Sequence, residues 1–72
     1  MRLVFDIETD GLDPTVIHCI VAKDVDTKAV YKFYWGMIPD GAKLLSMAKE
    51  LIGHNIVAYD MVVMRKFFPD LF

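Results

Sequence analysis

Residues 2–8 read "RLVFDIE", and the arrangement of the other elements can be worked out from this run. Successive side chains of a strand point to opposite faces. Here apolar side chains fall on both faces, at positions 3, 4, 5 and 7. A strand that is apolar on both faces is typical of the interior of a sheet. We therefore expect residues 2–8 to form a central strand.

Two further strands are predicted after it, separated by short turns. Residues 9–15, "TDGLDPT", contain the turn-forming pairs Asp-Gly and Asp-Pro. Residues 16–24, "VIHCIVAKD", and residues 29–35, "AVYKFYW", are rich in the β-branched and aromatic side chains that strands favour. Because short connections favour antiparallel neighbours, the first half of the chain predicts a three-stranded antiparallel meander.

The second half predicts a helix, an extended piece and another helix. Within residues 40–52, apolar side chains recur at helical spacing, with lysine and glutamate on the opposite side. Asp40 is the predicted N-cap, and Gly53 is predicted to follow the helix end. An extended piece within residues 54–60 precedes a helix over residues 59–68, which ends before a proline. The predicted order is β-β-β-α-β-α, with the fourth strand parallel to the first.

Length and composition agree with one α/β domain, residues 1–72. Hydrophobic residues make up 56% of the chain, which excludes a disordered protein. The net charge is −2, so any contact with a nucleic-acid phosphate has to be local. Cys19 is the one cysteine, which excludes an intrachain disulfide and a zinc cluster of thiolates.

We also expect a cytoplasmic protein with no membrane partner. A single, reduced cysteine fits a reducing compartment. Arg2 is followed at once by a strand pattern and acids, unlike a signal peptide. No apolar stretch approaches the roughly 20 residues that span a membrane.

Two carboxylates interrupt the predicted central strand. Asp6 and Glu8 are two residues apart, so they share a face, with Cβ atoms roughly 6.5 to 7 Å apart. Burial and like charge make such a pair unfavourable unless a cation is present. A hard divalent cation, Mg²⁺ or Mn²⁺, matches these oxygen ligands. The alternative is that Glu8 lies in water at the strand end and that Asp6 accepts backbone hydrogen bonds.

A second polar stretch, "GHNIVAYD" at residues 53–60, ends in Asp60 at the start of the next predicted helix. Each of its residues has a structural interpretation. The helix dipole favours an acid in the first turn, and His54 and Asn55 can satisfy loop backbone groups. The occurrence of both stretches in this order favours a common site.

The two stretches together resemble a known family. "FDIETDGL" at residues 5–12 and "HNIVAYD" at residues 54–60 are similar to the first and second motifs of DEDD-type 3′→5′ exonucleases, whose domain is ribonuclease H-like. The chain resembles most the N-terminal proofreading domain of phage-type family A DNA polymerases, from Leu3 to about Phe68. The resemblance implies a partial ribonuclease H-like fold. It also implies that the protein is located in the cytoplasm of a phage-infected host. It also implies a single-stranded DNA 3′ end as substrate.

The resemblance also implies roles for individual residues. Asp6 resembles the carboxylate that bridges two metal ions, Glu8 resembles a second ligand of one ion, and Asp60 resembles the acid that holds the other. In a complete site, two Mg²⁺ or Mn²⁺ ions about 3.5 to 4 Å apart generate hydroxide and stabilise the leaving oxygen. The positions that match nucleotide contacts are Thr9, Leu12, Asn55 and Tyr59.

The chain departs from the family at the third motif, which carries a fourth acid and a Tyr or His general base. Residues 70–72, "DLF", contain an acid but no such base. Loss of a general base costs about 10²- to 10⁴-fold in rate. We therefore expect a truncated or split domain that is weakly active or inactive alone. The remaining polymerase or exonuclease segment, or a self-partner, would complete it.

Alternatives stay open. A non-catalytic remnant would act as a protein-interaction or oligomerisation module, through a sheet face or edge left uncovered. A metal-binding ribonuclease H-like nuclease of another kind is a further option, although "HNIVAYD" speaks against it. The aromatic residues of 31–35 are either a stacking platform for nucleic acid or packing residues, and we expect packing.

Overall fold

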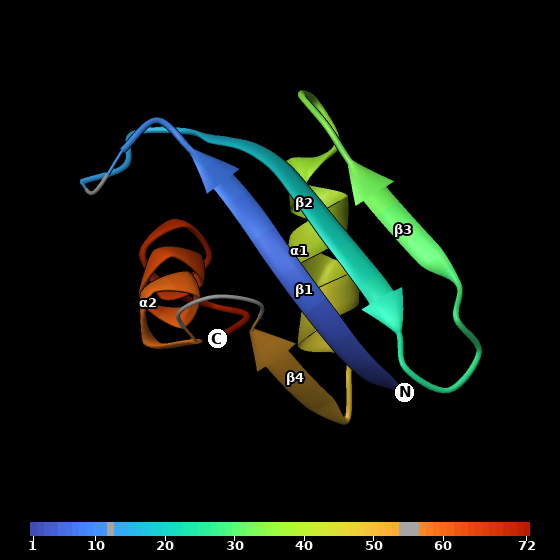
Figure 1. Ribbon diagram of the computed structural model, residues 1–72. Helices are drawn as coiled ribbons and strands as arrows, with labels where there is room; N and C mark the ends of the chain where they lie inside the picture. The colour runs from blue at the N-terminus through green and yellow to red at the C-terminus, as the bar shows by residue number, and fades with distance from the viewer. Residues whose placement is uncertain (12, 54–56) are drawn as a thin grey trace.

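The computed structural model describes residues 1–11, 13–53 and 57–72. The elements follow the predicted order, β-β-β-α-β-α (Figure 1). They are β1 (Arg2–Thr9), β2 (Ile17–Asp24), β3 (Val30–Phe33), α1 (Ile38–Ser46), β4 (Glu50–Gly53) and α2 (Val57–Phe67).

The strands form one mixed sheet in the order β3-β2-β1-β4. β2 pairs antiparallel with both β1 and β3, while β4 pairs parallel with β1. The predicted meander with a parallel fourth strand is therefore confirmed. β1 lies inside the sheet, as its apolar side chains on both faces predict.

One face of this sheet carries the core. Leu3, Phe5 and Ile7 of β1 are all at most 7% exposed. They belong to one cluster with buried side chains of both helices, namely Ala42, Leu45, Val63 and Met64. Both helices therefore cover the face on which Leu3, Phe5 and Ile7 lie, and in Figure 1 α1 runs behind the sheet.

The opposite face is covered by neither α1 nor α2, and we call it the open face. Alternation along β1 and the strand registers define its members. They are Arg2, Val4, Asp6, Glu8, Cys19, Val21, Lys23, Val30, Lys32, Glu50 and Ile52. The open face thus mixes apolar side chains with charges of both signs.

A β-bulge where β1 ends changes which residues of β2 face the core. Glu8 pairs with Cys19, but Thr9 pairs with Ile17, so His18 is the extra residue of β2. The bulge places Ile17 in the core and leaves His18 exposed. Thr9 consequently lies on the helix-covered face, opposite to its neighbour Glu8.

The first helix begins and ends earlier than predicted. It spans Ile38–Ser46 rather than residues 40–52. Its N-cap is Met37, so Asp40 lies in the first turn and the predicted cap is wrong. Pro39 lies in the first turn, where backbone N–H groups have no partner within the helix, so proline is tolerated there. The helix can therefore begin ahead of Asp40.

The fourth strand also lies earlier than predicted, at Glu50–Gly53 rather than within residues 54–60. Leu51 and Ile52 fit the helical spacing, but they pair with Leu3 and Val4 of β1. Pairing with the central strand therefore overrides the local helical pattern, and Gly53 is a strand residue rather than a helix terminator.

The third strand is shorter than predicted, and its aromatic residues divide into two kinds. Phe33 packs against the core cluster. A Cβ atom on Gly41 of α1 would lie 2.8 Å from Phe33 Cγ, so the absence of a side chain lets the helix sit on this ring. Tyr34 and Trp35 lie beyond the strand and are 52% and 88% exposed, so the packing prediction is wrong for both.

Neither helix of the described residues has the length and apolar character needed to cross a membrane.

Candidate functional site

Asp6 and Glu8 lie side by side on the open face of the central strand. Asp6 is half-buried and Glu8 is exposed. Across the sheet they pair with Val21 and Cys19 of β2. The shared face predicted from their spacing is therefore confirmed, and both carboxylates can be reached from solvent.

The pKa of the Cys19 thiol depends on the charge of these two carboxylates. Burial is the main cause that raises the pKa of the Cys19 thiol, and the carboxylates of Glu8 and Asp6 raise this pKa further. A thiolate at this position is disfavoured because both acids repel it. A cation bound by Asp6 and Glu8 would remove that repulsion.

Asp60 lies on the core-facing side of α2. It is in the first turn of α2 and is 4% exposed. It precedes the core residues Val63 and Met64 by three and four positions, so it shares their helix face. Within residues 1–11, 13–53 and 57–72, no three His, Cys, Asp or Glu side chains form a group that could hold a metal ion. The role of Asp60 as a metal ligand stays a prediction.

The carboxylates of Asp6 and Glu8 suit one Mg²⁺ ion by themselves. In proteins Mg²⁺ usually keeps several waters and binds through one or two carboxylates plus substrate phosphates. The exposure of Glu8 and the half-burial of Asp6 are compatible with such a hydrated ion. A two-ion site needs ligands in addition to this pair.

Two of the predicted nucleotide-contact residues meet at the end of β1. Thr9 Oγ1 lies 3.1 Å from the phenolic oxygen of Tyr59, although the residues are 50 positions apart. Both also reach the carbonyl oxygen of Gly11, Tyr59 at 2.7 Å and Thr9 at 3.0 Å. Leu12 and Asn55, the other two predicted contacts, lie outside the described residues.

The two hydroxyl protons of Thr9 and Tyr59 limit the number of hydrogen bonds that these side chains can donate. Each hydroxyl has one proton, and the three contacts among Thr9, Tyr59 and the Gly11 carbonyl therefore cannot all be filled at once. Tyr59 donates to Gly11 in the shortest contact, at 2.7 Å. A ligand atom that offers a donor would find free acceptor capacity on both hydroxyl oxygens.

The turn after β1 is held in place by polar contacts. The Asp10 carboxylate accepts hydrogen bonds from the Thr15 hydroxyl and from the backbone N–H groups of Thr15 and Val16. These bonds, with that of the Thr15 hydroxyl first, lower the pKa of Asp10 to about 2. Lys66 of α2 donates to the carbonyl oxygen of Pro14 at 2.8 Å.

Sequence reasoning missed this contact of Lys66. Its ammonium group also lies 3.2 Å from a carboxylate oxygen of Asp13. The partners are more than 50 residues away in the chain, so no local signal in the sequence indicates them.

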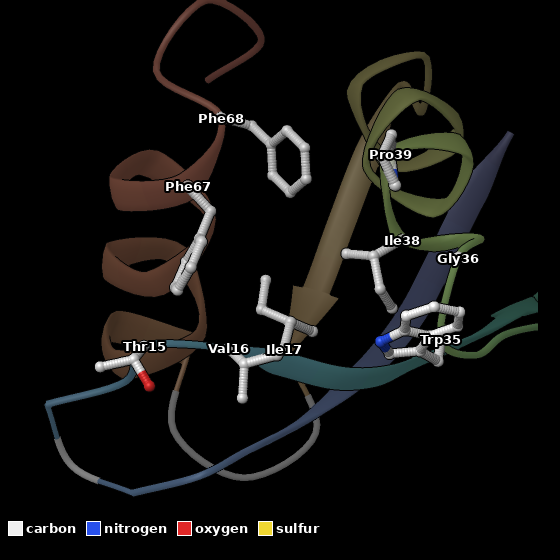
Figure 2. A pocket seen from close by; sticks show the side chains of 9 residues that line it. All are labelled: Thr15, Val16, Ile17, Trp35, Gly36, Ile38, Pro39, Phe67 and Phe68. Atoms are coloured by element: carbon white, nitrogen blue, oxygen red, sulfur yellow. The ribbon is translucent and has the colours of Figure 1, made fainter.

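An apolar groove of about 260 Å³ opens between the two helices and the start of β2 (Figure 2). Its walls include Phe67 at the end of α2, the following residue Phe68, Ile38 of α1, Ile17 of β2 and the exposed Trp35. No charged residue is among the described residues that line it. The groove therefore offers no charged partner for a phosphate or a metal ion among the described residues.

Comparisons of the chain with protein-family models, with curated proteins and with solved structures gave no match.

Proposed function

We propose that this chain is a metal-dependent 3′→5′ exonuclease domain of the DEDD type, which hydrolyses phosphodiesters at the 3′ end of single-stranded DNA. One observation carries the proposal. The two sequence stretches that resemble the family motifs meet in space, with Thr9 Oγ1 3.1 Å from the Tyr59 hydroxyl. The acids of the first stretch lie immediately before that contact, on β1.

The sheet supports the same proposal at a coarser level. An antiparallel meander with β4 added parallel to β1 is the arrangement that a partial ribonuclease H-like domain implies. In this arrangement Asp6 and Glu8 are on the central strand, which pairs with β4 before the acids and with β2 at the acids themselves. A rigid strand is a suitable support for metal ligands.

The chemistry is divided between the bound metal and the side chains around it. A divalent cation supplies an activated water and stabilises charge on the phosphate oxygens. Asp6 and Glu8 would hold the cation on the open face. Thr9 and Tyr59 place two hydroxyl groups at the end of β1, next to Glu8 but on the helix-covered side, from which they would contact the terminal nucleotide.

A nuclease assay tests the proposal. A single-stranded oligodeoxynucleotide is incubated with the chain and Mg²⁺ or Mn²⁺, and release of nucleoside monophosphate is measured. We expect slow release by the wild type, lost in Asp6→Ala and in Glu8→Ala. Asp70→Ala removes an exposed carboxylate elsewhere and is expected to retain the wild-type rate. Equal rates in all four proteins, or no release by the wild type, would remove catalysis from this chain.

The open face favours a second candidate function, a non-catalytic interaction or oligomerisation module. Val30 and Ile52 on this face are 53% and 36% exposed, and no helix of the described residues shields them. Exposed apolar patches mark interaction sites when they are contiguous.

Light scattering after size-exclusion chromatography separates the two candidate functions. A stable oligomer whose melting temperature does not respond to Mg²⁺ supports the module, whereas a monomer whose melting temperature rises supports the nuclease.

A further inference from the structure

We propose that Lys32 and Lys23 bind the backbone phosphates of the DNA strand whose 3′ end lies at Asp6 and Glu8. This inference rests on the proposed nuclease function and extends it with a substrate path across the open face. It assigns a function to two residues that neither family-like sequence stretch contains.

The strand registers place Lys32 level with the acids. Asp6 pairs with Val21, and Val21 pairs with Lys32, so the three residues form one row across the sheet. Two strand spacings of about 4.8 Å separate the backbones of Asp6 and Lys32 by roughly 10 Å. That is about the rise of three stacked nucleotides of a strand. A 3′-terminal phosphodiester held at Asp6 would therefore place a phosphate about three nucleotides toward the 5′ end of the same strand over Lys32.

Lys23 lies in the neighbouring row of the same face. It pairs with Val4 of β1 and with Val30 of β3. The two lysines thus lie on β2 and β3, to one side of Asp6 and Glu8, while Arg2 at the start of β1 is paired with Asp26. A metal ion bound to the acids would make this strip of the open face favourable for an anionic strand.

Both ammonium groups are available for a phosphate. Lys23 and Lys32 are exposed, and neither forms an ion pair with any of the described residues. Lysine on an edge strand commonly serves to prevent sheets from pairing with each other. That explanation can apply to Lys32 on β3, but it does not apply to Lys23, because β2 is an inner strand.

The net charge of −2 does not oppose this proposal. Phosphate contacts act locally, and their number appears in the salt dependence of binding. For a single strand, the slope of log affinity against log salt is about −0.7 for each neutralised phosphate. The slope of log affinity against log salt concentration therefore measures how many phosphates are neutralised by lysine side chains.

The test measures the fluorescence anisotropy of a labelled oligothymidylate with Mg²⁺ at several salt concentrations. We expect Lys32→Ala and Lys23→Ala each to weaken binding and to reduce the salt slope by about 0.7. The matched control is Lys43→Ala, an exposed lysine on α1, on the other side of the sheet. The control is expected to keep the wild-type affinity and slope.

The outcomes separate this inference from the proposed function. If the wild type binds and hydrolyses the oligonucleotide but both lysine variants match Lys43→Ala, the path is wrong and the nuclease stands. If the wild type neither binds nor hydrolyses it, both proposals fail. Circular dichroism of each variant shows whether the fold is kept. A lysine variant that unfolds is replaced by the corresponding Lys→Gln variant, to which the same expectation applies.

Discussion

At the scale of single residues, the hydroxyl group of Tyr59 links the two family-like stretches through the Gly11 carbonyl and Thr9. We expect Tyr59→Phe to reduce the free energy of unfolding by about 0.5 to 1.5 kcal/mol, the usual net value of one hydrogen bond. Urea unfolding measures the loss. Tyr34→Phe is the control, because the Tyr34 hydroxyl makes no hydrogen bond with the described residues and should leave the stability unchanged. Equal stability of both variants would show that the Tyr59 contact contributes nothing.

Gly41 offers a second test in which two effects have opposite signs. An alanine would gain about 1 kcal/mol of helix propensity. Its Cβ atom would, however, lie 2.8 Å from Phe33 Cγ and 3.1 Å from Ile20 Cδ1. Overpacking of this kind costs about 1 to 3 kcal/mol. We expect the clash to outweigh the gain, so that Gly41→Ala lowers the free energy of unfolding.

The control for Gly41 is a change of its ring partner. In Phe33→Leu the six-membered ring that crowds position 41 is absent. We expect Gly41→Ala to be less destabilising in that background than in the wild type. An increase of stability on Gly41→Ala in the wild type would contradict the close approach of α1 to β3.

The sequence predicts some residue positions and not others, for physical reasons. Asp6 and Glu8 share a face because alternation along a strand is strict. The face of Asp60 depends on how α2 packs, and that is decided by Val63 and Met64 meeting the core. Lys32 lies level with Asp6 because of two registers, that of β1 with β2 and that of β2 with β3. The sequence of a single strand does not specify these registers.

At the scale of elements, the turn after β1 has a defined response to acid. The Asp10 carboxylate accepts hydrogen bonds from Thr15 and Val16, and these lower its pKa from 3.8 to about 2. Because the folded-state pKa is lowered, the stabilising contribution is complete above pH 3.8 and is lost as the pH falls through about 2. We expect the turn to keep its structure throughout the range from neutral pH to pH 3.8.

Amide chemical shifts of Thr15 and Val16 measure this titration. We expect both to change with a midpoint near pH 2, the pKa of Asp10. The Asp10→Asn variant removes the carboxylate and shows the acid response of the rest of the chain. A midpoint at the ordinary value of 3.8 would mean that the Asp10 bonds are absent in solution.

The element boundaries show where local patterns stop being informative. The three strands of the meander were predicted within two residues at most ends, because β-branched runs and turn pairs coincide there. The boundary between α1 and β4 was wrong because Leu51 and Ile52 suit a helix and a strand equally well. The central strand β1 needs a partner on its second edge, and that requirement decides the structure of Glu50–Gly53.

At the scale of the whole molecule, the two faces of one sheet carry different functions. The helix-covered face holds the core, and β1 contributes Leu3, Phe5 and Ile7 to it. The open face carries the acids on β1 and the lysines on β2 and β3. If Asp6 and Glu8 bind a cation, as proposed, the open face carries a metal site on the same side of the sheet as these lysines.

The central claim is that Asp6 and Glu8 bind a divalent cation, and Cys19 permits a direct measurement. It is the one cysteine of the chain, and both acids raise the pKa of its thiol. We would measure the alkylation rate of Cys19 as a function of pH, with and without Mg²⁺. We expect Mg²⁺ to move the midpoint to lower pH in the wild type and to leave it unchanged in the Asp6→Asn, Glu8→Gln double variant. A wild-type midpoint that does not respond to Mg²⁺ would contradict the claim.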